Sequence, residues 1–497
     1  MQNPVRKLVI AGGGTAGWMA ASLLRKTLPK HIHIRLVESE EIGIVGVGEA
    51  TIPPIQTFNQ FLGIDEKAFL KETHATIKLA ISFENWRVPG EKYLHTFGAP
   101  GAQLGFSGFH HYWMRGKKEG LTDASLWDYD LNALCCDLGK FNKINTQNPM
   151  FDMQYAYHFD SALYGKFLRK VAEQLGVVRT EGMIEHVRQD TDTGFVTALQ
   201  LKSGEVVEGD LFIDCTGTRA LLSQKTLGVN YEDWSHWLPA DSALAVPSKR
   251  FESTLPYTRS IAHKVGWQWR IPLTHRNGNG IVYSSQYMSD DEAHDTLMGN
   301  LDSEALDTPR KISFRTGRTE QQWHKNVVSI GLSSGFLEPL ESTSIHLIQS
   351  GIVRLMKMFP NHGVQQSIVD LYNAESKHEF ETIRDFIILH YHVNERDDSD
   401  FWRDMRAMSI PERLKQKIEA FRTTSAIFNE NNDIFRDASW VQVMMGQGIT
   451  PVDYHPSADL PDAATLKQTL SKIYDAKRQP LEKMLAHDEF LTRYTGA

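Results

Sequence analysis

A glycine-rich segment near the N-terminus, Gly12-Gly13-Gly14-Thr15-Ala16-Gly17, has the spacing of a turn that binds dinucleotides. The apolar run Leu8-Val9-Ile10 precedes it, and an amphipathic segment follows. In such a turn Gly12 makes the tight bend, Gly14 lets the backbone approach a pyrophosphate, and Gly17 permits close packing of the next helix. Free amides at the helix start then hold the phosphates. The alternative is a purely structural turn. The predicted cofactor contacts are Gly12, Gly14, Thr15, Ala16 and Gly17.

Glu38 ends the next predicted strand, 33–38, and lies 21 residues after the last glycine of the motif. A carboxylate there can accept hydrogen bonds from a ribose. Two later segments, 210–217 and 327–335, read as buried strands that run into small-residue turns. The glycine motif occurs once in the sequence, at the N-terminal end, so the sequence offers no second motif for NADPH. The expected dinucleotide is therefore FAD.

Two charged side chains are candidates for catalysis. Lys78 is followed by the apolar residues 79–81, so we expect a buried ammonium, which needs a partner or a purpose. The alternative is a lysine at a strand end whose amine reaches solvent. Glu341 lies at the predicted start of a helix, before three hydroxyl residues. It either favours that helix end, with Ser342 or Thr343 as the cap, or supplies a fixed negative charge to a developing cation.

Trp267 and Trp269 alternate along the segment Trp267-Gln268-Trp269-Arg270-Ile271-Pro272. Many flavin monooxygenases bring a nicotinamide to the face of the flavin ring. Two indoles at this spacing would instead fill that face with side chains. The alternative is one packed face of a buried aromatic strand.

These segments together resemble the flavin-dependent halogenases of the tryptophan halogenase family. Residues 266–272 resemble the family's Trp-x-Trp-x-Ile-Pro signature, and Gly335-Phe336-Leu337-Glu338-Pro339-Leu340-Glu341-Ser342-Thr343 is a second match. Residues 46–53, 390–392 and 401–402 extend the resemblance over nearly the whole chain.

The resemblance implies an FADH2-dependent halogenase, with FAD reduced by a separate flavin reductase. In the family, hypohalous acid forms from oxygen and halide at the flavin and crosses an internal tunnel to a remote aromatic substrate. Lys78 matches the family lysine that hydrogen-bonds the oxidant or forms a haloamine. Glu341 matches a carboxylate that polarises the oxidant or accepts the ring proton. Two alternatives remain: an NAD(P)H-dependent FAD aromatic hydroxylase, and a catalytically silent flavin-binding protein.

The same resemblance assigns further residues around the flavin. Residues 46–53 are similar to a flexible strap that covers the cofactor, and Trp267 and Trp269 would block its face. The amides of Thr343 and Ser344 resemble a halide site at a helix start. Family members usually have glycine where this chain has Ser344, so both bromide and chloride are candidates. The further cofactor contacts implied are Val47, Ala50, Leu332 and Ile345.

The substrate side resembles the family in part. His95-Thr96-Phe97-Gly98 is similar to a motif in which His95 and Phe97 stack on the indole, and an ordinary aromatic loop contact is the alternative. Trp440 is a further candidate. Members specific for tryptophan carry paired tyrosines near the C-terminus, and residues 435–448 contain none. Without those polar groups a free amino acid would lose hydration without compensation. We therefore expect an indole-like or other electron-rich aromatic, or a tryptophan within a larger molecule.

Length and composition limit the remaining choices. The 497 residues, with 61 acidic and 53 basic side chains and a net charge of -8, do not suit a nucleic acid or an anionic membrane as partner. Three cysteines suit a reducing compartment, and the sequence lacks an apolar run of membrane length, so a cytoplasmic enzyme is expected. His390-x-His392 lacks a third ligand at metal spacing, so we predict no metal site. A monomer or a homodimer is equally compatible.

The predicted fold is α/β, with a Rossmann-like FAD-binding module of the flavin monooxygenase (GR2, hydroxylase) type. Residues 1–345 are expected to form this module, and 346–497 a mostly helical substrate-side region packed on it. Helix-period patterns predict helices over 376–390, 411–422 and 463–485. Pro451, Pro456 and Pro461 predict an irregular crossing between the last two helices.

Overall fold

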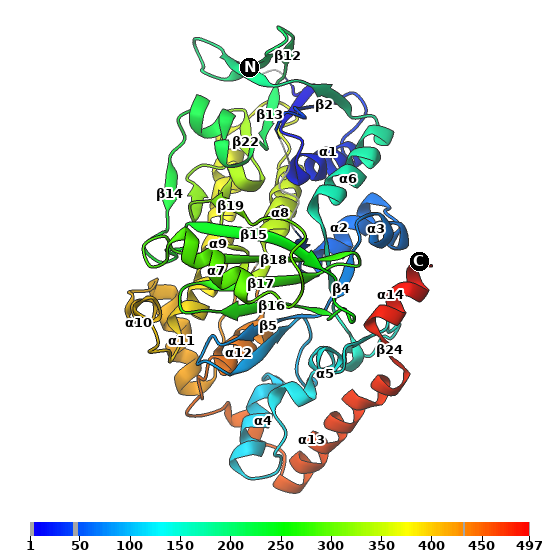
Figure 1. Ribbon diagram of the computed structural model, residues 1–497, viewed down its shortest axis with the longest axis vertical. Coiled ribbons are helices and arrows are strands. Elements are labelled where there is room, and N and C mark those ends of the chain that lie inside the picture. Colours follow the sequence, from blue (N-terminus) through cyan, green and yellow to red (C-terminus); the bar gives the residue numbers. More distant parts are fainter. Residues whose placement is uncertain (1–3, 43–47, 431–432, 497) are drawn as a thin grey trace. The chain divides into compact units, whose positions relative to one another are not determined.

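Parallel strands from well-separated parts of the chain, between residues 7 and 329, form the central sheet of one compact unit. The computed structural model describes residues 4–42, 48–430 and 433–496. The chain divides into two compact units, each built from three separate segments. Figure 1 shows the helices and strands, coloured from the N-terminus to the C-terminus. Unit 1 comprises Met1–Ala75, Phe159–Ser242 and Ile312–Glu381; unit 2 comprises Thr76–His158, Ala243–Lys311 and Thr382–Ala497. These boundaries follow compactness, and the functional division near residue 345 stays a prediction.

Unit 1 contains a six-stranded sheet in the order β21-β22-β13-β1-β2-β9. Neighbours from β22 to β9 pair in parallel, and β21 pairs antiparallel at one edge. The inner strands are apolar and buried, as in sheets covered on both faces. The bounds are β1 Lys7–Ala11, β2 His33–Glu38, β9 Val178–Glu181, β13 Leu211–Asp214, β21 Trp323–His324 and β22 Val327–Ser329. The strand expected over 33–38 is therefore confirmed.

Three helices of unit 1 pack together. Helix α1 (Thr15–Thr27) contacts both α6 (Ser161–Leu175) and α8 (Ser344–Lys357). The start of α1 packs closely against the glycine turn at Gly17. A Cβ at this position would lie 1.9 Å from the Gly12 carbonyl oxygen, so only glycine permits this packing. The other described elements of unit 1 are β3 Gly48–Ala50, α2 Pro54–Leu62, α3 Glu66–Glu72, β10 Ile184–Gln189, β11 Val196–Leu201, β12 Val206–Glu208, β14 Tyr231–Asp233, β20 Gly317–Thr319 and β23 Gly335–Phe336.

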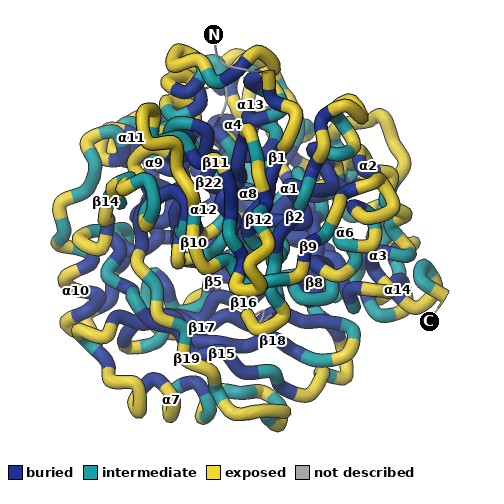
Figure 2. Tube along the Cα trace, turned by 90° about the horizontal axis from the view of Figure 1, so that it is seen from above, coloured by how far each residue is buried: buried dark blue, intermediate teal, exposed yellow. Residues whose placement is uncertain are grey.

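Unit 2 is built around a large sheet that contains, in order, β18, β17, β16, β5 and β6. All six residues of β17 are buried, because strands pair with it on both sides. Figure 2 shows β17 and β18 as largely buried chain. The bounds are β5 Ala80–Glu84, β6 Lys92–Thr96, β16 Tyr257–Ala262, β17 Trp267–Pro272 and β18 Arg276–Tyr283. A short strand, β4 (Thr76–Lys78), pairs antiparallel with β8 (Ala156–Asp160).

The C-terminal part of the chain is mostly helical, as predicted. Its helices are α9 Gln366–His392, α10 Asp400–Ala407, α11 Glu412–Thr424, α12 Asp437–Gly446, α13 Ala463–Arg478 and α14 His487–Thr495. The helix expected over 463–485 is too long, because α13 ends at Arg478. Pro480 follows in a short 3-10 turn, 479–483, where its ring and missing N–H do not suit a continuing α-helix. The irregular crossing around the three prolines is confirmed; it includes the 3-10 turn Pro456–Asp459.

The remaining described helices of unit 2 are α4 Phe109–Lys118, α5 Leu131–Leu138 and α7 Asp290–Gly299. Two short strands, β7 (Lys140–Phe141) and β24 (Leu485–Ala486), pair antiparallel and tie α14 to the chain that follows α5. Within the described ranges, none of the helices has the combined length and apolar character needed to cross a membrane. The same residues contain no cluster of three or more side chains suited to a metal ion.

Candidate functional site

The predicted nucleotide turn joins β1 to α1 in unit 1. Gly12 has a φ of +108°, and a Cβ there would lie 2.2 Å from the Cys215 carbonyl oxygen, so glycine is required. At Gly14, the residue before α1, a Cβ would meet no atom within 4 Å among the described residues. Open space at the start of a helix suits a phosphate. Thr15 is anchored through its Oγ1, which donates to the Ser161 carbonyl at 3.2 Å.

Glu38 stands at the end of β2 beside this turn, as the sequence predicts for a ribose contact. Its Oε1 accepts from Arg179 Nε at 2.5 Å, and its Oε2 accepts more weakly from Trp18 Nε1 at 3.3 Å. A Cβ at Gly13 would lie 1.5 Å from Oε2, so the turn and the carboxylate fit against each other. A carboxylate can accept about four hydrogen bonds, which leaves capacity for a ribose. Sequence reasoning missed Arg179, which lies 141 residues away.

The turns predicted after two later strands gather beside the nucleotide turn. Asp214, which ends β13, is fully buried and accepts from the amides of Thr216, Leu222 and Ser223. Its side chain therefore holds its own turn and is not a free cofactor ligand. A Cβ at Gly331, after β22, would lie 2.8 Å from Ala16 Cβ. Leu332 follows with 45% of its surface exposed, so its side chain is accessible to a cofactor.

The loop that carries Glu341 is buried and tightly bent. A 3-10 turn, Pro339–Glu341, leads into Ser342, whose φ of +59° is rare for a residue with a side chain. Glu341 is 1% exposed and Thr343 also 1%. The capping alternative is wrong for Thr343: it occupies the N-cap of α8, and its side chain accepts no capping hydrogen bond from the described residues. Ile345, in the first turn of α8, is buried at 3% exposure.

A buried charge network joins α8 to α9, and no local pattern in the sequence predicts it. Glu379 on α9 accepts from His346 Nε2 at 3.0 Å, Ser350 Oγ at 2.8 Å and Arg354 Nη2 at 2.6 Å. Burial alone would raise the pKa of Glu379, but the hydrogen bond and charge of His346 and the charge of Arg354 outweigh it and lower this pKa to about 2. The network fixes α8 beside α9 within unit 1.

Lys78 ends β4 in unit 2 and is fully buried. The alternative of an amine that reaches solvent is therefore wrong. The Nζ of Lys78 lies 5.1 Å from the centroid of the Phe97 ring, within the range of a cation–π contact. The Phe97 amide donates to the Leu79 carbonyl at 3.0 Å. The ring is thus held beside the lysine by the backbone of the next residue.

Predicted substrate residues of unit 2 share two aromatic neighbours that sequence reasoning did not single out. Phe386 and Phe435 stack with ring centroids 3.8 Å apart. The His95 ring lies 5.5 Å from Phe386 and 6.2 Å from Phe435. Trp440 meets Phe386 edge to face at 4.9 Å, and Lys417 Nζ lies 4.3 Å from the Trp440 ring. We call His95, Phe386, Phe435 and Trp440 the aromatic cluster.

Gln442 joins helix α12 to the end of β6 and to the loop that follows this strand. The Thr96 amide donates to Gln442 Oε1 at 2.8 Å, and Gln442 Nε2 donates to the Gly98 carbonyl at 3.3 Å. Both groups of a fully buried amide side chain are thereby satisfied. Because Trp440 is on the same helix, Gln442 fixes the loop relative to that indole. The only hint in the sequence is a polar residue among apolar ones.

The two tryptophans of β17 are packed side chains. Trp267 is 1% and Trp269 8% exposed, with ring centroids 6.2 Å apart. Trp267 also lies 6.4 Å from Trp86, and a Cβ at Gly280 on β18 would collide with the Trp269 ring. The aromatic-strand alternative describes this packing, and the role of blocking the flavin stays a prediction.

The predicted site residues fall into two sets, one in each unit. Unit 1 holds the nucleotide turn, Glu38, Ala50, Leu332, Glu341, Thr343, Ser344 and Ile345; unit 2 holds Lys78, His95, Phe97, Trp267, Trp269 and Trp440. Ala50 ends β3 and is buried at 3% exposure. Val47 lies outside the described residues.

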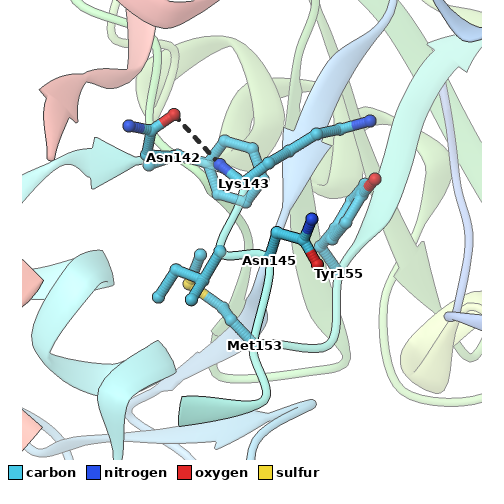
Figure 3. Close-up of a pocket in the computed structure, with 7 residues that line it drawn as sticks. Asn142, Lys143, Asn145, Met153 and Tyr155 are labelled. Atoms are coloured by element: carbon cyan, nitrogen blue, oxygen red, sulfur yellow. Dashed lines mark hydrogen bonds between the residues drawn. The ribbon is translucent and has the colours of Figure 1, made fainter. Parts of the chain in front are cut away.

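A small cavity of about 260 Å³ opens elsewhere in unit 2. It is lined by Phe141, Asn142, Lys143, Ile144, Asn145, Met153 and Tyr155 (Figure 3). Lys143 Nζ donates to the Tyr494 hydroxyl at 2.9 Å, so the cavity borders α14. Its lining includes none of the predicted site residues.

Comparison with known proteins shows the family to which this chain belongs. The family model described as tryptophan halogenase matches residues 7–463. Tryptophan 7-halogenase RebH from Lentzea aerocolonigenes is 35% identical, with all of both chains covered. Xcc4156, a flavin-dependent halogenase from Xanthomonas campestris, is 48% identical with a TM-score of 0.96, and 99% of each chain is covered. BrvH, a flavin-dependent halogenase from Brevundimonas sp. BAL3, is 42% identical with a TM-score of 0.94, again over 99% of each chain. The chain belongs to the tryptophan halogenase family.

Proposed function

We propose that this protein halogenates an electron-rich, indole-like aromatic ring beside Lys78, at a site remote from the flavin. Membership of the family makes it a flavin-dependent halogenase, an oxidoreductase that uses a halide and FADH2 from a separate flavin reductase. The observation that carries the proposal is the fully buried Lys78 with the Phe97 ring 5.1 Å from its amine. A buried amine beside an aromatic face can act at short range on an oxidant and on a ring, because charges interact more strongly where water is excluded.

The residues of the nucleotide turn fit FAD. Gly12, Gly14, Thr15, Ala16 and Gly17 would hold the pyrophosphate, and Glu38 the ribose. Open space at Gly14 and the partly exposed Leu332 support this assignment. When bound, reduced FAD would activate oxygen, which then oxidises the halide by two electrons to hypohalous acid. Ala50, Val47, Leu332 and Ile345 would contact the flavin, with Trp267 and Trp269 covering its face.

Lys78 would receive the oxidant by a hydrogen bond to hypohalous acid or as a haloamine. Transfer of the halogen to the ring releases a ring proton, and water forms from the remaining hydroxyl when the oxidant is hypohalous acid. Glu341 would polarise the oxidant or take up that proton. Its burial at 1% exposure supports an electrostatic role, because a charge acts more strongly where water is excluded.

The halide would bind at the amides of Thr343 and Ser344. The start of α8, and the absence of a side-chain cap there among the described residues, support this site. The Cβ and hydroxyl of Ser344 would shape the space left for the ion. We propose bromide as the preferred halide, because it is more easily oxidised than chloride.

The substrate would stack against His95 and Phe97, with Trp440 as a further wall. Contacts of His95 and Trp440 with the same phenylalanines support a common aromatic surface. Relatives such as RebH are named for tryptophan. Without a tyrosine pair in 435–448, this chain offers less to a free amino acid. A monomer or homodimer remains our proposal for the assembly. We also propose a cytoplasmic location, which the three buried free thiols support.

A competition experiment tests this function. Purified protein receives FAD, a flavin reductase, NADH, oxygen and equal bromide and chloride, and mass spectrometry follows indole, a phenol, a pyrrole and tryptophan. We expect bromoindole as the main product and little bromotryptophan. Preferred halogenation of free tryptophan would contradict the proposal. Flavin reduction by NADPH without the reductase would instead favour a hydroxylase.

Lys78→Ala tests the lysine itself. We expect bromoindole formation to fall about 100-fold or more, with FAD binding unchanged. The matched control is Lys477→Ala: Lys477 is also buried, at 3% exposure, but its Nζ donates to the Met150 carbonyl at 2.7 Å. Unchanged turnover in Lys78→Ala would refute the role of this amine.

A further inference from the structure

Among the described residues, the strand that carries Lys78 pairs with a strand on one edge only, and on the other edge a histidine side chain and a backbone carbonyl accept its hydrogen bonds. On the first edge β4 pairs with β8, with Thr76 opposite His158 and Lys78 opposite Ala156. Alternate amides of a strand point to opposite sides, so Ile77 and Leu79 donate away from β8. Ile77 N donates to His487 Nε2 at 3.1 Å, and Leu79 N donates to the Pro256 carbonyl at 2.7 Å. The two residues on either side of Lys78 are fixed by these bonds.

His487 is itself fixed in one orientation and one tautomer. Its Nδ1 lies 2.9 Å from the Thr254 carbonyl oxygen, which can only accept, so Nδ1 carries the proton. Nε2 is then free to accept from Ile77. Asp488, the next residue, accepts from the Thr254 amide at 2.8 Å. The first two residues of α14 thus form hydrogen bonds with both the carbonyl and the amide of Thr254. Thr254 lies two residues before Pro256, whose carbonyl accepts the hydrogen bond from Leu79.

A second histidine fixes Thr76 from the other side. Thr76 Oγ1 donates its proton to the Pro272 carbonyl at 2.7 Å, so its contact with His158 Nδ1 at 2.9 Å requires an N–H on the ring. His158 Nε2 then accepts from the Thr258 hydroxyl at 2.9 Å. His158 and His487 are both fully or almost fully buried and neutral in this arrangement. Burial, the largest cause, and the charge of Lys78 both lower the pKa of His158, which agrees with a neutral ring beside β4.

We infer that His487 is a positioning residue for Lys78, through which the C-terminal helix α14 sets the place of the amine. The inference rests on the proposed function of Lys78. The backbone amide of His487 donates to the Gly139 carbonyl at 2.9 Å, and β24 pairs with β7. These bonds hold the start of α14 in place. A shift of the strand by a fraction of an ångström would move the amine relative to Phe97. Oxidant would then form as before and escape before it reaches the ring.

The test separates oxidant formation from oxidant use. His487→Leu, which removes both hydrogen bonds, is supplied with FAD, reductase, NADH, oxygen, bromide and indole. Bromoindole is measured beside hypobromous acid trapped with monochlorodimedone. We expect bromoindole to fall about 10- to 100-fold while trapped oxidant stays within about twofold. His487→Gln, whose Oε1 can replace Nε2 as acceptor, should recover much of the loss.

Hydrogen exchange in the protein without cofactor gives a second readout. The amides of Ile77 and Leu79 should exchange faster in His487→Leu than in wild type. The matched control is His110→Leu, because His110 is also buried and its Nε2 bonds the Ser425 carbonyl at 3.0 Å, away from β4. The control should change neither the exchange of these amides nor the ratio of bromoindole to trapped oxidant.

Lys78→Ala run in parallel distinguishes the two claims. If Lys78→Ala keeps full bromoindole formation, the proposed role of Lys78 fails. If Lys78→Ala loses the product while His487→Leu keeps the wild-type ratio and exchange rates, the inference about His487 alone fails. Should His487→Leu lose FAD binding or its thermal transition, Asp488→Asn takes its place, because it weakens the same hold on Thr254. A wild-type ratio in Asp488→Asn would then overturn the inference.

Discussion

The Phe97 ring lies 5.1 Å from the Nζ of Lys78, and both side chains belong to the same compact unit. The ring is held there by the hydrogen bond from its own amide to the Leu79 carbonyl at 3.0 Å. An aromatic face beside an ammonium stabilises the charged amine. The same face is suited to stack on an indole, so Phe97 connects the proposed reactive amine with the substrate.

Replacing Phe97 by leucine should impair the use of indole. The leucine keeps an apolar contact but removes the aromatic face, worth about 0.5–2 kcal/mol to a cation. We expect kcat/KM for indole to fall about tenfold, mainly through KM, while FAD binding stays unchanged. Steady-state kinetics at several indole concentrations measure it. Phe141→Leu, at an aromatic residue that lines the separate cavity, is the control. Equal losses in both variants would contradict a specific role for Phe97.

Replacing Ser344 by glycine should change halide selectivity. Ser344 begins α8, and its side chain adds a hydroxyl and a Cβ beside the amides proposed to bind the ion. We expect the ratio of chlorinated to brominated indole to fall about two- to fivefold, because the larger bromide gains more from the added space, a change of about 0.4–1 kcal/mol in selectivity. The ratio is measured in equal bromide and chloride. Ser471→Gly, at an exposed position of α13, serves as control. An unchanged ratio in Ser344→Gly would argue against halide binding at this helix start.

Removing the charge of Glu379 should destabilise unit 1. Its carboxylate is bound by His346, Ser350 and Arg354, and breaking a buried ion pair costs about 3 kcal/mol. Glu379→Gln should therefore lower the free energy of unfolding by about this amount, measured by urea denaturation. The control is Glu375→Gln: Glu375 also faces Arg354, at 3.4 Å, but is about half exposed, so its loss should be within about 1 kcal/mol. Similar losses in both would contradict the network.

Acid should destabilise unit 2 through His487. Burial, the first cause, and the charge of Arg250 lower its pKa from 6.5 to about 4, against the opposing effects of Thr254 and Asp488. Between these values the unfolded chain binds the proton and the folded one does not, so stability falls as the pH falls from 6.5 to 4. The loss is about 3 kcal/mol. Urea unfolding at pH 7 and pH 4 measures it. His487→Gln should show a smaller difference; an equal one would exclude His487 as a cause.

Much of the nucleotide-binding half could be predicted from the sequence, because its signals are local. The strand 33–38 and the glycine turn each follow from a few consecutive residues, and the structure confirms them. The same holds for the burial of Lys78 in unit 2. The amphipathic pattern predicts the next helix from Trp18 to Leu28, whereas α1 begins earlier, at Thr15. The end of α13 at Arg478 could have been foreseen from Pro480, which the helical pattern concealed.

The contacts that support the sites could not be predicted in the same way. Arg179 reaches Glu38 across 141 residues, and Gln442 reaches Thr96 across 346. His487 meets Ile77 across 410 residues. Each depends on how distant segments pack, and a single sequence shows no pattern at those separations. The residues themselves, an arginine on a strand and a histidine at a helix start, are unremarkable in composition.

The interleaving of the two units bears on how the protein is made. Unit 1 has its last segment once Glu381 has been synthesised, whereas unit 2 needs residues up to the C-terminus. On the ribosome, Thr76–His158 therefore emerges long before the segment from Thr382 onward that completes its unit. For most of translation, apolar strands such as β5 are therefore exposed, because the residues that bury them in the folded unit have not yet been synthesised. Slow translation or lack of chaperones during expression should therefore cost more soluble product here than in a protein whose units are continuous in sequence.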